Sequence, residues 1–540
     1  MKRDPKTEIC KVEEGPTGIL RLTRPGGSPE TYLPNCDMDA AIELLKEFQE
    51  LKDVATATSL KDNYHCEGFD WYPAMVSQLF WYVFLPWVKY APLAADAIQG
   101  RKTFVFEGLG NFRGLMLTLD LASGRLPRRS WKLYLFEWLW KLNNELLVRR
   151  KKCDVVFFRF AAKDFRSKDI LQALDDLGIN YIPAVPSHGI WTAAANILRR
   201  GPDYFFAQPP PVWHGNRFGH SYDLTGFSVE KSVLFSAAVA LVERTLTSCV
   251  ADMRLHRRWL RQFGARVFYG FDDVNTYIFP LLYAARSLGL FTLGHQHGAY
   301  AKRHAGYTMP GLPDRSFVWF DRVLVWGSYW RDKMVREAPV HPPEIWAVGA
   351  NKLKHAYTPS RGQTPSAAPS NILIPYEFLA DTATIGKFIQ RFVDSGYTVW
   401  FRPRPDEPAN NQLDAYVLPE ETREKLRLAQ GPLNNELLSK IDIVAGTTST
   451  MLYELLAAGK IVWYLDTSCS LLYDLVDEHL AHRIRLEDIQ PPEHMQGALT
   501  SATRPPANVF FKTGTLEATL KANLPFTTLI SNKHCGRIKL

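Results

Sequence analysis

The sequence lacks the features that mark several large protein classes. Its seven cysteines are scattered and form no Cys-X-X-Cys pair, which argues against a zinc site or disulfide framework and for reduced thiols in the cytoplasm. No apolar stretch follows the charged N-terminal residues, so no secretory signal is predicted. The longest apolar run, 79–88, contains Pro86 and is too short to span a bilayer as a helix. It is predicted to lie in a core, with a position at a membrane interface as the alternative.

Nucleic-acid-binding motifs and internal repeats are also missing, and the charge balance is mild. The chain has 540 residues and a formal net charge of +8. This excess suits an anionic small substrate or an acidic membrane surface, and without a motif it does not indicate nucleic acid. A chain of this length exceeds one ordinary core, so at least two domains are expected.

What the sequence does contain, from about residue 100 onward, is an alternation of short apolar strands and helices. This alternation predicts parallel sheets with right-handed crossovers. A Pro/Ser/Gly-rich break at 357–370 interrupts the pattern, which then restarts. The predicted fold is therefore α/β, with two Rossmann-like domains whose parallel sheets face a cleft. The predicted parts are an N-terminal elaboration (1–95), a first domain (96–350), a linker (351–370), a second domain (371–505) and a segment that packs back on the first domain (506–540).

Polar residues just after predicted strands are the candidate site residues, because ligands of open α/β sheets bind beyond the carboxyl ends of the strands. The strands are predicted at 103–106, 154–160, 181–184, 266–269, 290–293, 322–326, 345–348, 371–374, 398–401, 441–444 and 461–465.

The most informative of these sites follows the strand at 441–444. Gly446 ends that strand, and the hydroxyl residues Thr447, Thr448, Ser449 and Thr450 precede a helix. Free N–H groups and the positive end of the helix dipole would make this turn an anion site, with the hydroxyls as further donors and an N-cap. The expected guest is the phosphate of a sugar nucleotide. The alternative is a helix that is simply well capped.

Several acidic or basic groups follow strands of the first domain. His297, in the sequence Gly-His-Gln-His-Gly, is placed to act as a general base, because an imidazole ordinarily titrates near neutrality. Gln296 and Gly298 would shape its turn, and a histidine bonded to the backbone is the alternative. Asp272 or Asp273 is a candidate base or nucleophile while the other caps a helix, and Glu107 is a weaker candidate of the same kind.

The second domain offers cations and further polar groups. Arg402 and Arg404 stand in the sequence Phe-Arg-Pro-Arg-Pro and suit phosphate, unless they pair with the acidic residues that follow. Other candidates are Tyr376 and Glu377 after the first strand, Glu454 in the helix as a ribose ligand or a surface residue, and Gly349 and Asn351 at the hinge. No metal site is expected.

Taken in order, the segments HQHG, VGAN, FRPRP and AGTTSTMLYELLAAGK resemble GT-B glycosyltransferases of bacterial surface polysaccharides. The pattern is similar to capsule and lipopolysaccharide transferases that use CMP-activated acid sugars such as Kdo, and to CDP-glycerol glycerophosphotransferases. The resemblance covers roughly residues 265–485. It implies a base role for His297, phosphate contacts for Thr448, Ser449 and Thr450, and a nucleophile at Asp272 or Asp273. Where these families carry His, this chain has Arg404, which cannot donate a proton at neutral pH.

The resulting expectation is a metal-independent glycosyltransferase that moves a sugar from a nucleotide donor, with a CMP-sugar favoured, to a saccharide or glycolipid acceptor. It would need no cofactor and would work in the cytoplasm, with peripheral contact to the inner membrane as an option. The alternatives are a nucleotide-sugar 2-epimerase of the same fold, and a non-catalytic protein of polysaccharide assembly.

Overall fold

A computed structural model of the chain describes most of its length. The described residues are 8–15, 18–34, 36–107, 110–122, 131–150, 152–160, 164–186, 194, 197–198, 205–208, 218–271, 274–312, 318–349, 369–377, 379–404, 409–431, 433–495 and 505–525. The predicted linker lies almost wholly outside these ranges, as do Asp272, Asp273 and Asn351.

The first lobe is built on a seven-stranded, fully parallel sheet with the order β13-β12-β11-β10-β7-β8-β9. From β7 to β12 the order is the Rossmann 3-2-1-4-5-6, with its switch point between β7 and β10. The central strands are buried on both faces, which explains their continuous apolar sequence. The bounds are β7 (Val155–Phe158), β8 (Tyr181–Pro186), β9 (Phe205–Gln208), β10 (Val267–Phe271), β11 (Phe291–His295), β12 (Arg322–Val325) and β13 (Trp346–Val348).

Helices cover this sheet, and the longest of them was not predicted. Helix α8 (Val229–Phe263) begins at a Ser228 cap, ends at Gly264 with a φ of 68°, and packs on α9 (Phe279–Ser287) and α4 (Asn111–Ala122). Among the described residues α8 alone is long and apolar enough to cross a membrane, but 56% of its apolar window is buried in the protein. That burial marks α8 as a core helix. The other helices of this lobe include α5 (Trp131–Arg150), α6 (Lys168–Asp176), α10 (Ala305–Thr308) and α11 (Ser328–Glu337).

The N-terminal unit has a sheet of its own, with the order β3-β2-β1-β6. The strand predicted at 103–106 does form, as β6 (Lys102–Glu107), but it pairs with β1 (Glu8–Glu14) and not with the seven-stranded sheet. The prediction that it belongs to the first Rossmann-like sheet is therefore wrong. Other elements of this unit include β2 (Leu20–Thr23), β3 (Glu30–Tyr32), α1 (Met38–Gln49), α2 (Pro73–Leu79) and α3 (Leu85–Ile98). Most of the apolar run 79–88 lies in their core, although Tyr82 is exposed.

The second lobe repeats the plan of the first. Its parallel sheet has the order β16-β15-β14-β17-β18-β19, again 3-2-1-4-5-6, with the switch point between β14 and β17. The strands are β14 (Asn371–Pro375), β15 (Thr398–Arg402), β16 (Arg427–Leu428), β17 (Ile443–Gly446), β18 (Ile461–Leu465) and β19 (His482–Ile484). Its helices include α12 (Thr382–Asp394), α13 (Ala409–Leu413), α14 (Glu420–Lys425), α15 (Asn435–Ser439), α16 (Met451–Ala457) and α17 (Asp474–Asp477). The predicted fold class, two Rossmann-like domains with parallel sheets, is confirmed.

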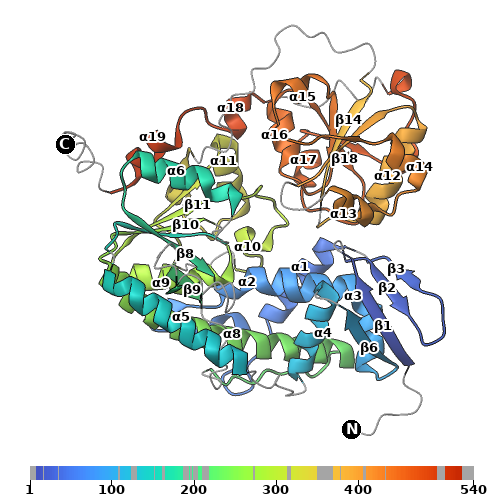
Figure 1. The fold of residues 1–540 in the computed structure, drawn as a ribbon. Coiled ribbons are helices and arrows are strands. Elements are labelled where there is room, and N and C mark those ends of the chain that lie inside the picture. The colour runs from blue at the N-terminus through green and yellow to red at the C-terminus, as the bar shows by residue number, and fades with distance from the viewer. Residues whose placement is uncertain are drawn as a thin grey trace.

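After the second lobe the chain returns to the first. The indole of Trp330 donates to the Phe510 carbonyl at 2.9 Å, and the amide of Lys512 donates to the Trp326 carbonyl at 2.8 Å. Helix α18 (Ala507–Phe510) also contacts α16, and α19 (Leu516–Asn523) lies against α6. Figure 1 shows the three parts, with the second lobe in orange above the blue N-terminal unit and beside the green first lobe.

Candidate functional site

Loops that follow the carboxyl ends of strands in the two lobes touch one another. The amide of Lys302, in the loop after β11, donates to the Asp474 carboxylate after β18 at 2.8 Å. We call this contact region the seam, formed by residues 296–304 and α11 from the first lobe and residues 466–478 from the second. The seam brings together the sheet edges where ligands of open α/β sheets bind.

A buried ion cluster holds the seam together. The ammonium of Lys333 on α11 is 1% exposed and lies 2.7 Å from Asp474 and 2.9 Å from Glu478. Tyr329 donates to the second oxygen of Glu478, and Arg336 reaches the first from the solvent side at 2.9 Å. A charge buried in this way is tolerated only because it is fully paired.

The hydroxyl turn after β17 is an anion site, but its anion comes from the protein itself. The buried carboxylate of Glu377, after β14, accepts from the amides of Thr447, Thr448 and Ser449 at 2.7–2.9 Å. It also accepts from the Thr447 hydroxyl at 2.7 Å. The prediction that these amides await a phosphate is therefore wrong in this structure, because β14 and β17 are neighbours and Glu377 reaches across.

Burial raises the pKa of Glu377, while the hydrogen bonds from the Thr447 hydroxyl and the three amides lower it in part. A side chain at position 446 would collide with this carboxylate, which explains the glycine there. Thr447 is fully buried, whereas Thr448, Ser449 and Thr450 remain partly exposed. The Ser449 hydroxyl accepts from the Met451 amide at 3.3 Å, while the Thr450 side chain makes no cap bond.

The other predicted residues of the second lobe lie along the same edge. The guanidinium of Arg402 donates to the Ala429 carbonyl after β16 at 2.8 Å, so it leans away from β17. Gln412 clamps the main chain of Arg404 with two hydrogen bonds of 2.8 and 3.0 Å. Tyr376 is buried beside Tyr416, and Glu454 is partly exposed on α16.

His297 lies on the first-lobe side of the seam. Its Nδ1 is 3.1 Å from the Tyr307 hydroxyl, and its ring meets Phe271 edge to face at 6.2 Å. Gln296 shapes the turn, since its side chain donates to the Gly298 carbonyl and accepts from the Trp326 amide, both at 2.9 Å. The imidazole is therefore fixed from one side by a phenol, an arrangement that sequence reasoning did not include.

Two other histidines of this lobe are structural. His295 is buried with its Nδ1 2.6 Å from the Tyr269 hydroxyl, and the Nε2 of buried His341 lies 3.1 Å from the Tyr307 carbonyl. Burial lowers the pKa of His295 to about 3 and that of His341 to about 4. Both are neutral at physiological pH.

These two histidines should make the protein acid-sensitive. Below pH 6.5 these histidines bind protons in the unfolded chain but not in the folded state, so the free energy of unfolding falls as the pH falls. The loss is about 1.4 kcal/mol per histidine at pH 5.5. We expect the urea midpoint to drop between pH 7.5 and 5.5. In His341→Gln about one proton fewer is taken up on unfolding, so the unfolding free energy should depend less steeply on pH. An unchanged slope in that variant would contradict the assignment.

The remaining predicted residues lie away from the seam or outside the described ranges. Glu107 is half exposed on β6 and pairs with Lys11 at 2.8 Å, so its predicted place beside the cleft is wrong. Gly349 has a φ of 136° and packs against Thr519 of α19, which occupies the space a side chain would need. Asp272, Asp273 and Asn351 fall outside the described residues. Within those residues no three His, Cys, Asp or Glu side chains converge as a metal site would require.

Comparison with known proteins gives likeness at the level of architecture. No protein-family model and no curated protein matches the sequence. The glycosyltransferase SnogD from Streptomyces nogalater is 13% identical, with 69% of this chain and 99% of that one covered and a TM-score of 0.40. CalG4, the calicheamicin glycosyltransferase, is 13% identical, with 65% of this chain and 90% of that one covered and a TM-score of 0.39. The UDP-GlcNAc 2-epimerase of Methanocaldococcus jannaschii is 11% identical, with 68% of this chain and 98% of that one covered and a TM-score of 0.40.

Proposed function

We propose that the protein is a GT-B-like glycosyltransferase that binds a nucleotide sugar at the seam. The observation that carries this proposal is the meeting of two Rossmann-ordered sheets through loops at their carboxyl ends. Partly exposed hydroxyls at Thr448, Ser449 and Thr450 lie at that edge of the second lobe, and an imidazole lies at that edge of the first.

In this proposal the donor phosphate is held by side chains and not by the amides of the turn. The hydroxyls of Thr448 and Ser449 donate to it, and Arg404 supplies positive charge to the leaving group. The resemblance to CMP-sugar enzymes favours a cytidine nucleotide. The acceptor would be a saccharide or a glycolipid at the cytoplasmic face of the membrane, in line with the net charge of +8.

His297 would take the proton from the acceptor hydroxyl. For this its Nδ1–H donates to the Tyr307 oxygen, which leaves the lone pair of Nε2 to accept the proton. Tyr307 would thus be a positioning residue that selects the tautomer. The reverse arrangement, with the phenol donating, would place a hydrogen on Nε2 and abolish the base.

The first test is a thermal-shift screen against CMP, CDP, UDP and GDP. A nucleotide at 100 times its Kd stabilises the folded state by about 2.7 kcal/mol, so one of the four should raise the melting temperature. Absence of a shift with all four nucleotides at millimolar concentration would refute the proposal.

Variants should separate binding from chemistry. The pair Thr448→Ala with Ser449→Ala should weaken nucleotide binding about 30-fold, because two hydrogen bonds of about 1 kcal/mol each are lost. His297→Ala should lower kcat by about 10² or more with nucleotide affinity unchanged. Nucleotide release from a panel of CMP-, CDP-, UDP- and GDP-sugars measures turnover, and Ser395→Ala, at the far edge of the second sheet, is the control. Normal turnover in both the Thr448/Ser449 variant and the His297 variant would contradict these roles.

One observation favours a second candidate, a non-catalytic protein of polysaccharide assembly. The carboxylate of Glu377 already fills the amide turn that would cradle a phosphate, and Arg404 stands where related sequences carry His. Nucleotide binding without turnover against any sugar donor would support this candidate over the transferase.

A further inference from the structure

A hollow lies at the opposite edge of the second sheet from the seam. Its volume is about 560 Å³, within the range of small-ligand sites. It is lined by the first residues of β14 and β16, by residues just before β17 and by Trp400 in the middle of β15; these residues are Asn371, Trp400, Arg427, Ser439, Lys440 and Asp442. Strands β14 and β15 have five residues each, so about 15 Å separates this edge from the carboxyl edge.

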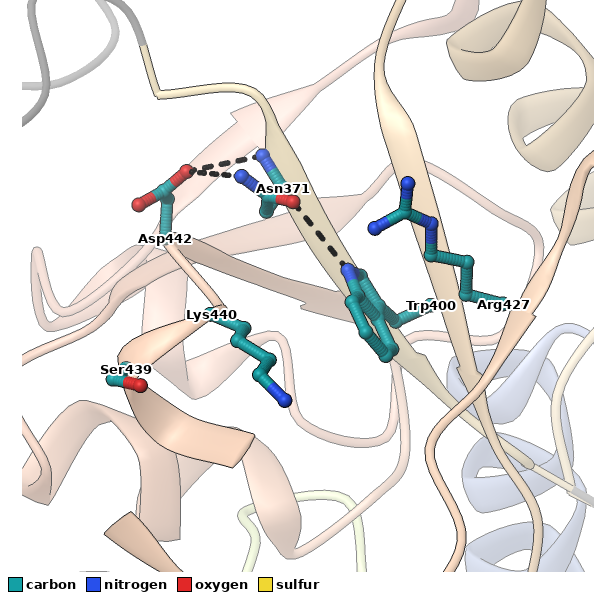
Figure 2. Close-up of a pocket in the computed structure, with 6 residues that line it drawn as sticks. All are labelled: Asn371, Trp400, Arg427, Ser439, Lys440 and Asp442. Atoms are coloured by element: carbon teal, nitrogen blue, oxygen red, sulfur yellow. Dashed lines mark hydrogen bonds between the residues drawn. The ribbon is translucent and has the colours of Figure 1, made fainter. Parts of the chain in front are cut away.

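Trp400 provides a flat apolar surface flanked by cations. The Arg427 guanidinium lies 5.4 Å from the centre of the Trp400 ring, and the indole N–H donates to the Asn371 side chain at 3.4 Å. Figure 2 shows the Lys440 side chain extending toward Trp400 from the other side. Arg427 is exposed and has no carboxylate partner in the described part of the chain.

A fixed carboxylate stands beside this surface. Asp442 Oδ2 accepts from the amides of Ser370 and Asn371 and from the Asn371 side chain, at 3.0–3.2 Å. These three bonds hold the carboxylate in place through one oxygen. Its other oxygen, Oδ1, has no protein partner among the described residues and is available to accept from a ligand hydroxyl.

The charges of the hollow decide the chemistry of its ligand. Arg427 and Lys440 are positive, whereas Asp442 and Glu436, the ion-pair partner of Lys440 at 2.9 Å, are negative. This balance disfavours a polyanion such as nucleic acid, which needs a continuous basic surface. It suits a ligand with many hydroxyls, an apolar ring face and a single acidic group.

We infer that this hollow binds an acidic saccharide. One sugar ring lies on the Trp400 indole, its hydroxyls bond to Asn371 and Asp442, and its carboxylate pairs with Arg427 and Lys440. The site is separate from the seam and does not depend on the transfer chemistry proposed there. In a transferase it would hold an acidic chain at a distance from the reacting end.

Calorimetric titration with matched probes tests this inference. The probes are a trisaccharide that contains glucuronic acid, and the same trisaccharide with its carboxyl reduced to an alcohol. The acidic probe should bind saturably and about tenfold more tightly than the reduced one. Arg427→Ala and Lys440→Ala, at exposed positions, should reduce that tenfold preference, and Lys425→Ala, an exposed cation outside the hollow, should leave it unchanged.

Trp400→Ala should abolish binding of both probes, and Trp400→Phe should retain part of it. Because Trp400 also packs on the core, melting curves of both variants accompany the titrations. Equal binding of the two probes, no binding of either, or binding of inorganic phosphate or CMP at this site in place of the saccharides would overturn the inference. Since the seam is untouched by these variants, nucleotide binding measured alongside shows whether the proposed function stands or falls separately.

Discussion

An alanine at position 377 should destabilise the second lobe by about 3–5 kcal/mol. The Glu377 carboxylate is buried and accepts hydrogen bonds from four donor groups, which are three consecutive amides and the Thr447 hydroxyl. Its removal leaves these donors without an acceptor, and each unsatisfied buried group costs about 1–3 kcal/mol unless water enters. Urea unfolding followed by circular dichroism measures the loss.

Two variants bracket this result. Glu377→Gln keeps one acceptor oxygen but turns an NH₂ group toward amide donors, so it should fall between wild type and alanine. Glu421→Ala removes an exposed carboxylate of the same lobe that pairs with Lys425, and should leave the stability nearly unchanged. A Glu377→Ala protein as stable as Glu421→Ala would show that the turn needs no internal anion.

Replacing Lys333 by methionine should cost about 3–5 kcal/mol and loosen the two lobes. The ammonium is buried between Asp474 and Glu478, so its loss removes the cation that lies within hydrogen-bond distance of both carboxylates. The cost comes from buried negative charge that has lost its cation and not from lost side-chain volume, because methionine is of similar size. Urea unfolding and limited proteolysis at the seam are the measurements.

The surface member of the same cluster provides the control. Arg336 is 55% exposed, so Arg336→Met should cost less than about 1 kcal/mol. The double variant Lys333→Met with Asp474→Leu should recover about half of the loss, because a buried pair can be replaced by apolar groups with little penalty. Strictly additive losses in the double variant would show that the two residues do not interact.

Local sequence patterns predicted most strands of the two large sheets, but not the edge strands β9, β16 and β19. The strand predicted at 461–465 is β18, and those predicted at 371–374 and 398–401 differ from β14 and β15 by one residue. These strands are short apolar runs between clear helix ends, so their location depends on neighbours along the chain.

Long-range pairing was beyond the reach of such patterns. Strand β6 has an ordinary strand sequence, and only its pairing with β1, almost a hundred residues earlier, places it outside the first lobe. Glu377 was predicted as a donor-binding residue because it follows a strand. The turn that it contacts lies 70 residues further on. The local sequence does not distinguish a carboxylate that binds a ligand from one that occupies the place of a ligand's phosphate.

The same limit applied to α8 and to the seam. The 35 residues of α8 include a long apolar window, but serine, threonine and charged residues interrupt it, so no unbroken apolar run marks the helix in the sequence. Lys333 looks like an ordinary surface lysine in sequence, and its burial depends on two acids contributed by the other lobe.

The return of the chain through α18 and α19 has a consequence for synthesis on the ribosome. Phe510 and Lys512 bond to the indole of Trp330 and the carbonyl of Trp326, and Thr519 covers Gly349 at the end of β13. Because translation proceeds from the N-terminus, the first lobe emerges early yet waits, with this surface bare, until more than 150 later residues have been made. The first lobe is therefore completed only after the second lobe has been made. Until then, the aromatic surface around Trp326 and Trp330 is where a chaperone would be needed.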